Sequence, residues 1–319
     1  MKPHLLLFLS IILLIPLSCP APSREKAEVK RDSIPETEDN GTGFIDNDGN
    51  EIVFENPFVR IIPLYSSHVE NLFAIGAGSS VIGIPRGTDY PPEATVLPVF
   101  DYLGDPEYVI AAEPDLVLIR PFVRRQSPDY IKKIENAGIP VVSLYCESFE
   151  NFDSYILRLG MLTGKVQEAE TKLGAFHREL AEIQKRALSI QKKKTVFFES
   201  TENEIRTAAS ESLPDKAIEF AGGINVTPHL PPISPGSSIA RFGAEALLDI
   251  ADNIDVYVVQ QGAMNRSSDM ENLKTRPGFS AIKAIQEGQV LFINEKLISS
   301  VTFRYLEGVK ILSGYLGGF

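Results

Sequence analysis

The chain has 319 residues, and its 44% hydrophobic and 23% charged residues are average proportions for a soluble globular protein. Its formal net charge of −11 argues against a nucleic-acid or anionic-membrane surface, since neither attracts a net-negative protein. Two cysteines are too few for a disulfide framework or a tetrahedral thiolate zinc site. The length fits one large domain or two modest ones.

An apolar run over residues 5–17 is shorter than a membrane span and is typical of the hydrophobic region of a signal peptide. Ser18-Cys19 at its end resembles a bacterial lipobox, in which the cysteine is lipidated, although Pro16 stands where the lipobox usually has leucine. The alternative is an ordinary cleaved signal followed by an incidental cysteine. We predict a signal peptide over residues 1–18 and lipidation at Cys19.

A polar stretch with almost no large apolar residue follows the cysteine. Such a composition cannot bury a core, so we predict a lipid-anchored, flexible tether over residues 19–43.

From residue 59 onward, short apolar runs alternate with helical patterns. The predicted strands are 59–64, 81–84, 116–119, 140–145, 195–199, 255–259 and 289–293, and the predicted helices include 68–76, 106–112, 213–221, 244–252 and 279–287. This alternation predicts two α/β units with mainly parallel sheets covered on both faces. Asp105 is expected to cap the helix 106–112, with Pro106 at its first position.

The two units are separated by a long helical pattern. Its apolar residues recur at alternating spacings of three and four, at Val166, Ala169, Leu173, Phe176, Leu180, Ile183, Ala187 and Ile190. We predict one connecting helix over 166–192, between lobes over 44–165 and 193–319, which would act as a semi-rigid hinge. A two-chain coiled coil is the weaker alternative, because the pattern is short and domains flank both of its ends.

Both units contain a glutamate at the start of a short amphipathic helix that leads into a buried strand. Glu107 opens the first such segment and Glu245 the second. This repetition favours two similar lobes that face each other across a cleft.

Catalytic signatures are missing from the sequence. It contains no P-loop, His-Glu-x-x-His, Cys-x-x-Cys or Gly-x-Ser-x-Gly motif. Gly76-Ala77-Gly78 lacks the third glycine of a dinucleotide fingerprint and predicts a helix C-cap instead. The histidines are scattered, at positions 4, 68, 177 and 229, and Cys146 reads as a buried apolar residue. We therefore predict no catalytic residue, no metal site and no cofactor.

A series of short segments runs through the chain in a characteristic order. It comprises Phe58–Gly78, Val81–Ile84, Asp89–Ala94, Leu97-Pro98, Glu107–Leu118, Ala137–Val142, Leu159–Gly164, Ala221–Asn225 and Gly288–Ile293. These segments resemble the substrate-binding proteins of ABC importers for iron complexes and cobalamin, and residues 46–52 resemble the short hairpin that opens their fold. The resemblance covers about residues 44–319.

This resemblance implies an α/β fold of two Rossmann-like lobes with central parallel sheets, joined by one long helix. It implies a periplasmic or otherwise extracytoplasmic monomer that touches the membrane only through its lipid anchor. Such a protein delivers a small-molecule metal chelate to a permease dimer with its ATPase. It also implies that Glu107 and Glu245 dock on permease arginines, although acids at helix N-termini are favoured by the helix dipole alone.

Ligands of open α/β sheets bind beyond the carboxyl ends of the strands. The predicted cleft residues there are Tyr65, Ser66, Arg86, Tyr90, Arg120, Phe122, Arg206, Arg241, Met264 and Arg304. Arginine and aromatic side chains suit a flat anionic chelate, through bidentate contacts and stacking. Some of these arginines, and the pair Arg124-Arg125, are equally consistent with a solvated rim.

Ferric siderophores and haem both fit this chemistry, and Tyr65, Tyr90 or His229 are candidate haem-iron ligands. The absence of tryptophan disfavours cobalamin, whose large apolar corrin is commonly packed by aromatic side chains. We expect a non-enzymatic binding lipoprotein for an iron chelate. The alternatives are a cobalamin-binding importer component, a chelatase-like enzyme on the same fold, and a sensor lipoprotein.

Overall fold

A computed structural model describes residues 42–146, 148–202, 204–234, 236–265 and 268–317. The predicted signal peptide, Cys19 and nearly all of the predicted tether lie outside the described residues. Within the described ranges, no helix combines the length and the apolar character needed to cross a membrane.

The first lobe, which we define as the elements from β1 to α5, is built on a parallel sheet of order β3-β6-β7. Its strands are β3 (Ile61–Pro63), β6 (Leu116–Ile119) and β7 (Val141–Ser143), and all of their residues are buried. Such continuous apolar strands are typical of a parallel sheet with both faces covered. The prediction for 116–119 is confirmed, whereas β3 and β7 are shorter than predicted because only their central residues join the ladder.

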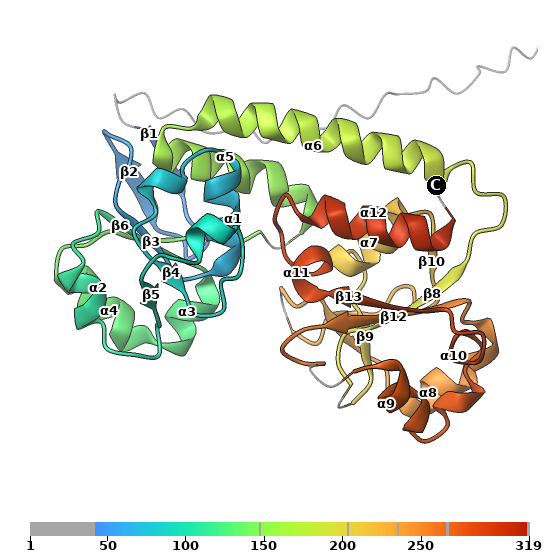
Figure 1. Cartoon of the computed structure of the whole chain (residues 1–319). Coiled ribbons are helices and arrows are strands. Elements are labelled where there is room, and N and C mark those ends of the chain that lie inside the picture. The colour runs from blue at the N-terminus through green and yellow to red at the C-terminus, as the bar shows by residue number, and fades with distance from the viewer. Residues whose placement is uncertain (1–41, 147, 203, 235, 266–267, 318–319) are drawn as a thin grey trace, which may run out of the picture. The chain divides into compact units, whose positions relative to one another are not determined.

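Helices cover this sheet on both faces (Figure 1). They are α1 (Ser66–Ala74), α2 (Glu107–Ala111), α3 (Pro121–Gln126), α4 (Pro128–Asn136) and α5 (Phe152–Thr163), with the short turns η1 (Gly78–Ser80), η2 (Pro92–Ala94) and η3 (Phe149–Asn151). The strand predicted at 81–84 is wrong in its position. Val81 makes a single bridge to Ile61, and the strand is β4 (Ile84–Pro85), which pairs with β5 (Val99–Phe100).

A hairpin of β1 (Thr42–Ile45) and β2 (Glu51–Phe54) opens the described fold, as residues 46–52 predicted. The carboxylate of Asp46 accepts hydrogen bonds from the backbone N–H groups of Asp48 and Asn50, which closes the turn. The same carboxylate accepts from the Ser143 N–H at 3.1 Å. One aspartate therefore ties the hairpin turn to the end of β7.

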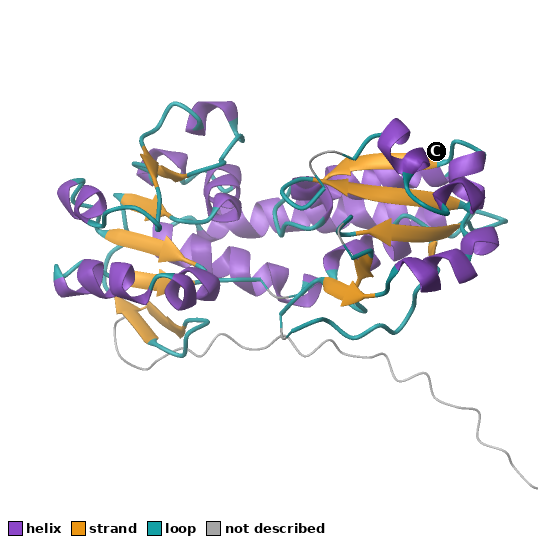
Figure 2. Ribbon diagram, turned by 90° about the horizontal axis from the view of Figure 1, so that it is seen from below, coloured by secondary structure: helices purple, strands orange, loops and turns teal. Residues whose placement is uncertain are grey.

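The second lobe, from β8 to α12, contains a parallel sheet of order β10-β8-β12-β13 (Figure 2). The strands are β8 (Thr195–Glu199), β10 (Ile224–Asn225), β12 (Val256–Gln261) and β13 (Val290–Asn294), and β9 (Arg206–Ala208) pairs with β11 (Ile239–Arg241) beside them. The helices are α7 (Leu213–Phe220), α8 (Ala244–Asp249), α9 (Met270–Thr275), α10 (Lys283–Gln286), α11 (Glu295–Ile298) and α12 (Tyr305–Leu316), with the turns η4 (Ala251–Asn253) and η5 (Phe279–Ala281). The predicted α/β class with central parallel sheets is confirmed.

One long helix, α6 (Val166–Ala187), lies between the lobes in sequence and ends before the predicted residue 192. Its buried residues are Ala169, Leu173, Phe176, Leu180, Ile183 and Ala187, which the alternating spacing predicted. Val166 and Ile190, at the two ends of the predicted stripe, are not buried. The lobe boundaries at 165 and 193 remain predictions.

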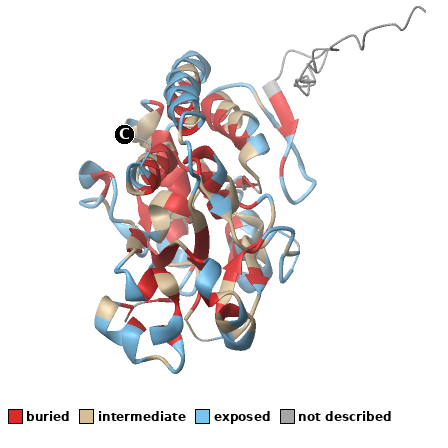
Figure 3. Ribbon diagram, turned by 90° about the vertical axis from the view of Figure 1, so that its right-hand side faces the viewer, coloured by how far each residue is buried: buried red, intermediate tan, exposed pale blue. Residues whose placement is uncertain are grey.

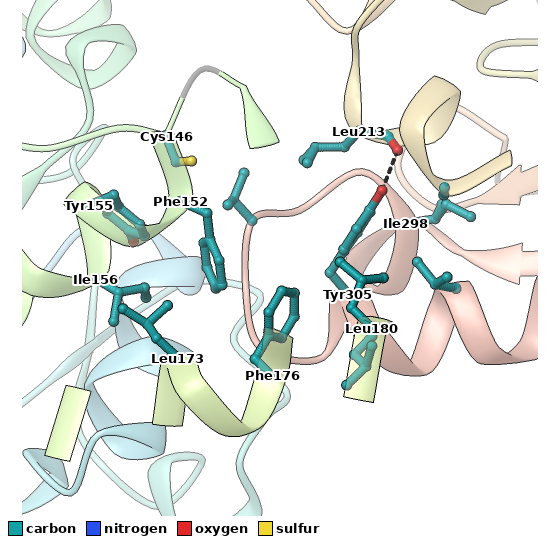
Figure 4. Packing of buried hydrophobic residues seen from close by; sticks show 14 of the residues in the cluster. Cys146, Phe152, Tyr155, Ile156, Leu173, Phe176, Leu180, Leu213, Ile298 and Tyr305 are labelled. Atoms are coloured by element: carbon teal, nitrogen blue, oxygen red, sulfur yellow. Dashed lines mark hydrogen bonds between the residues drawn. The ribbon is translucent and has the colours of Figure 1, made fainter. Parts of the chain in front are cut away.

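The buried side of α6 packs against α5 of the first lobe and against α12 and α7 of the second. Leu173, Phe176 and Leu180 point into one hydrophobic cluster, in which the rings of Phe152 and Tyr305 lie on either side of Phe176 (Figure 4). Buried residues lie along the strands and on the inner faces of the helices, and exposed residues lie on the outer faces of the helices (Figure 3). The cluster contains residues of both lobes, so the two share one continuous core along α6.

Tyr305 gives a test of this shared core. Its buried hydroxyl donates a 2.7 Å hydrogen bond to the Leu213 carbonyl (Figure 4). Tyr305→Phe leaves that carbonyl without its donor, so we expect the free energy of unfolding, measured by urea denaturation, to fall by about 1–2 kcal/mol. Tyr315→Phe, a half-buried position in the same helix, is the matched control. Equal losses in the two variants would contradict a role for this hydrogen bond.

Candidate ligand-binding site

A pocket of about 600 Å³ lies where the loops after β6 and β7 meet a segment of the second lobe. Its lining residues are Arg120, Pro121, Phe122, Arg125, Tyr145, Ser234, Gly236 and Ser237. The first five follow the carboxyl ends of two neighbouring parallel strands, which is the usual location of ligands in open α/β sheets. We call this the cleft pocket.

The guanidinium of Arg120 lies close to two aromatic rings. It lies 4.6 Å from the centroid of the Tyr65 ring and 4.8 Å from that of the Phe122 ring. Tyr145 extends this aromatic wall, with its ring 6.3 Å from that of Tyr65. Arginine and the negative face of an aromatic ring attract each other, so the guanidinium is oriented before any ligand arrives.

The charges of the cleft pocket have a single sign. Arg120 and Arg125 are its charged lining residues, and no carboxylate is among the residues described there. Two arginines beside aromatic faces favour a ligand that is both anionic and flat, because guanidinium groups make bidentate contacts to carboxylates and stack on planar groups.

The local sequence explains how Arg120 reaches this position. Ile119 is the last residue of β6, and Arg120 keeps an extended backbone as the residue before α3. Pro121 then supplies the first helical position, where its missing N–H costs no hydrogen bond. The strand therefore ends and the helix begins around a single arginine.

A buried histidine supports the same strand end. His68 on α1 lies 3.1 Å, through Nε2, from the Ile119 carbonyl oxygen, and 2.8 Å, through Nδ1, from the hydroxyl of Tyr155. Burial lowers the pKa of His68 from 6.5 to about 3; the bond to Ile119 opposes the shift and the charge of Arg120 adds to it. His68 is therefore neutral at physiological pH. Because a carbonyl only accepts, Nε2 carries the proton and Nδ1 accepts from Tyr155.

Two of the predicted cleft residues lie at a second pocket, of about 340 Å³, which α1, α6 and α12 help to form. There the guanidinium of Arg304 lies 4.1 Å from the centroid of the Tyr90 ring. Its Nη1 is 3.6 Å from Oε1 of the buried Glu70. Burial raises the pKa of Glu70, and Arg304 and Thr302 oppose this rise. The predicted cleft residues therefore do not share a single pocket.

The other predicted cleft residues line neither pocket. Ser66 begins α1, next to Tyr65, and Arg206 pairs with Glu204 beside β9. Arg86 is 80% exposed and pairs with Asp101 at 3.0 Å. Arg241 and Met264 are exposed. Their contact with a ligand stays a prediction.

The candidate iron ligands are dispersed. Tyr65 lies against Arg120, Tyr90 lies against Arg304, and His229 is exposed, with a left-handed backbone conformation. Among the described residues, no group of three or more His, Cys, Asp and Glu side chains is arranged to hold a metal ion.

Sequence reasoning missed Tyr145 as a site residue and interpreted Arg125 as half of a solvated pair. Both line the cleft pocket. The rule that selected Arg120 after β6 applies equally to Tyr145, two residues beyond the end of β7, and would have found it. No comparable signal distinguished Arg125 from Arg124, which instead makes ion pairs with Asp48 and Glu135.

The two predicted docking glutamates are exposed, each in the first turn of a short helix. Glu107 is the first residue of α2, and Glu245 lies in α8. The predicted cap is shifted by one residue: α2 begins after Pro106, and Asp105 accepts a hydrogen bond from the Glu107 N–H at 3.1 Å. Among the ion pairs of the described residues, neither glutamate takes part.

Comparison with known proteins identifies the class to which this fold belongs. Residues 61–297 match the family model of periplasmic binding proteins, so the chain belongs to that family. It is 26% identical to the uncharacterized ABC transporter substrate-binding lipoprotein YvrC of Bacillus subtilis strain 168, over 96% of this chain and 94% of that one.

Two further proteins are similar to this chain. The vitamin B12-binding protein of Vibrio campbellii is 28% identical over 53% of this chain and 62% of its own length. A solved structure of a possible iron-binding (periplasmic solute-binding) protein from Staphylococcus epidermidis superposes with a TM-score of 0.70 at 23% identity, covering 82% of this chain and 99% of that one. This likeness supports the two-lobed fold.

The buried His68 predicts a pH dependence of stability. Its pKa is about 3 when folded and near 6.5 when unfolded, so between these pH values the unfolded chain binds one proton more than the folded chain. Stability should therefore fall as the pH is lowered from about 6.5 toward 3, by up to about 1.4 kcal/mol per pH unit from this residue.

Urea denaturation at a series of pH values measures this dependence. His68→Gln should show a shallower slope than the unmodified chain in this range. His177→Gln, at an exposed histidine of α6 that pairs with Asp153, is the comparison variant, and His68→Gln should change the slope more than it does. Identical slopes for His68→Gln and the unmodified chain would exclude the buried neutral histidine as the cause.

Proposed function

We propose that the chain is an extracytoplasmic lipoprotein that binds an iron chelate, a ferric siderophore or haem, in the cleft pocket and delivers it to an ABC importer. Cys19 would carry the lipid, and residues 19–43 would tether the folded lobes to the membrane surface. Family membership and the similarity to an ABC transporter substrate-binding lipoprotein support the transport role.

One observation carries the proposed ligand class: the aromatic, cationic wall of the cleft pocket. Arg120 lies against the rings of Tyr65 and Phe122, and Arg125 adds a second positive charge. A haem presents a flat ring and carboxylates, and many ferric siderophores are anionic. Stacking and bidentate hydrogen bonds to these groups use the features that this wall provides.

Titration of the purified chain with ferric siderophores, haem and cobalamin, followed by tyrosine fluorescence, tests the ligand. The chain has ten tyrosines and no tryptophan, so quenching reports on tyrosines such as Tyr65 and Tyr145. For the ligand that binds, Arg120→Gln should raise the Kd at least about tenfold, because it removes a charged hydrogen-bond donor. Arg86→Gln, at an exposed arginine outside the pocket, is the control. Flat curves for all three ligands would refute the proposed ligand class.

Cobalamin is a second candidate, favoured by the similarity to a vitamin B12-binding protein. Its corrin is large and its periphery carries amides rather than several free carboxylates. Cobalamin binding should therefore depend less on the charge of Arg120 than the binding of an anionic chelate does. The same titration separates the two candidates.

Delivery to a permease requires a docking surface, and we assign this role to Glu107 and Glu245. Exposed ion pairs of this kind set orientation and encounter rate more than affinity. Glu107→Ala combined with Glu245→Ala should reduce cellular uptake of the bound chelate severalfold and leave its Kd unchanged.

The matched control for docking is Glu170→Ala combined with Glu182→Ala, at two exposed positions on α6. It changes the net charge equally and should leave uptake intact. Uptake that survives in the Glu107/Glu245 double variant would overturn the docking assignment.

A further inference from the structure

The end of α6 and the loop that follows it carry a local excess of positive charge. The segment from Gln184 to Lys194 contains five basic residues and no acidic residue, and these are Lys185, Arg186, Lys192, Lys193 and Lys194. Figure 1 shows this loop beside the second lobe, at the opposite end of α6 from β1. The positive charge is therefore concentrated at one place in a chain whose formal net charge is −11.

The lysines of this segment are not neutralised by carboxylates. Lys185, Lys192 and Lys193 are exposed. Lys194 is half-buried and donates a 3.3 Å hydrogen bond to the Tyr315 carbonyl. Among the ion pairs of the described residues, none includes any of these four lysines. Their charge therefore faces solvent and is available to a partner.

Carboxylates on the neighbouring elements do not pair with these lysines. On α7, Glu219 lies 3.3 Å from Lys216. Asp255, whose carboxylate accepts from the first residue of β8, lies 2.6 Å from Lys283. Glu182, one turn earlier on α6, is exposed and makes no ion pair within the described part of the chain. The excess of positive charge therefore persists at the end of α6.

Exposed apolar side chains lie in the same place. Leu188, the residue that follows α6, is 81% exposed. Ile224 is 47% exposed and lies beside Lys194, since its N–H donates to the Lys194 carbonyl at 2.9 Å. The segment thus combines positive charge with apolar surface. We use the name basic corner for Lys185, Leu188, Lys192, Lys193 and Lys194.

This combination is typical of surfaces that bind membranes. Each lysine close to an anionic membrane surface strengthens binding about fivefold, and a leucine side chain enters the boundary between headgroups and acyl chains. A nucleic acid attracts lysines as well, but it offers no apolar layer for Leu188. The net charge of the chain does not prevent such binding, because charges more than about 8 Å away are largely screened at physiological salt.

We propose that the basic corner binds the surface of a membrane that contains anionic lipids. The lysine ammonium groups pair with the lipid phosphates, and Leu188 enters the headgroup region. The choice of a membrane as the partner rests on the proposed function, in which the chain is a lipoprotein tethered beside one.

Membrane binding and permease docking use different parts of the surface. In Figure 1, α6 lies along the top of the molecule, whereas α2 and α8, which carry Glu107 and Glu245, lie lower. Contact of the basic corner with lipid therefore does not cover the two glutamates.

Co-sedimentation of the purified full chain with lipid vesicles tests the proposal. The chain carries Cys19→Ser so that no lipid is attached, and the vesicles contain either phosphatidylcholine alone or equal parts of phosphatidylcholine and phosphatidylglycerol. Neutral vesicles measure any attraction by the apolar run 5–17. We expect at least about tenfold stronger binding to the anionic vesicles in 0.1 M NaCl. This difference should disappear in 1 M NaCl, where the Debye length falls to about 3 Å.

Variants locate the binding surface. Lys185→Gln, Lys192→Gln and Lys193→Gln together should weaken binding to the anionic vesicles at least about tenfold. The matched control replaces three exposed lysines elsewhere, Lys132→Gln, Lys133→Gln and Lys274→Gln, and should weaken it less than about twofold.

The apolar contact has its own pair of variants. Leu188→Ser should weaken binding to the anionic vesicles about threefold or more, because the side chain no longer enters the headgroup region. Leu103→Ser, at a position that is 67% exposed in the first lobe, should leave binding unchanged.

Three outcomes would overturn the assignment: equal losses in the two triple variants, equal binding to anionic and neutral vesicles, or binding to double-stranded DNA without binding to anionic vesicles. The chelate titration of the same variants keeps this test apart from the proposed function. The basic corner shares no residue with the cleft pocket, so the Kd for the chelate should be the same in the triple variant as in the unmodified chain.

Discussion

The apolar stripe of α6 is the constraint on which the rest of the structure depends. Each lobe has a sheet of only three or four main strands, and the largest hydrophobic cluster includes residues from both. Leu173 and Phe176 pack toward α5, while Leu180 lies beside Tyr305 of α12. Because these side chains lie on one rigid helix, displacing either lobe from it would expose part of a shared core to water.

Buried polar groups connect this core to the cleft pocket. His68 bonds to the end of β6 and to Tyr155, and Asn71 donates to the Val301 carbonyl of the second lobe at 2.9 Å. These hydrogen bonds lie where water is excluded, so the loss of any one of them would leave a buried polar group unpaired at a high cost in free energy. The end of β6 is therefore held in one position. The wall formed by Arg120, Tyr65 and Phe122 is therefore rigid for structural reasons, before any ligand binds.

The cleft pocket and the second pocket, of about 340 Å³, differ in the sign and balance of their charges. The cleft pocket is cationic because Arg120 and Arg125 line it, and aromatic because Phe122 and Tyr145 do. The second pocket places the Glu70 carboxylate 3.6 Å from the Arg304 guanidinium. A flat anion fits the first.

The sequence by itself determined the α/β class, most of the strands, the buried stripe of α6 and the exposed glutamates, because these follow from periodicity and local chain chemistry. Strand 116–119 and the spacing from Ala169 to Ala187 depend on side chains a few residues apart. Only the tertiary structure decided that Tyr90 and Arg304 line a different pocket from Arg120, and that Tyr145 and Arg125 line the same pocket as Arg120. Such groupings bring together residues up to about two hundred positions apart, and their distances depend on how the helices pack, which no local pattern encodes.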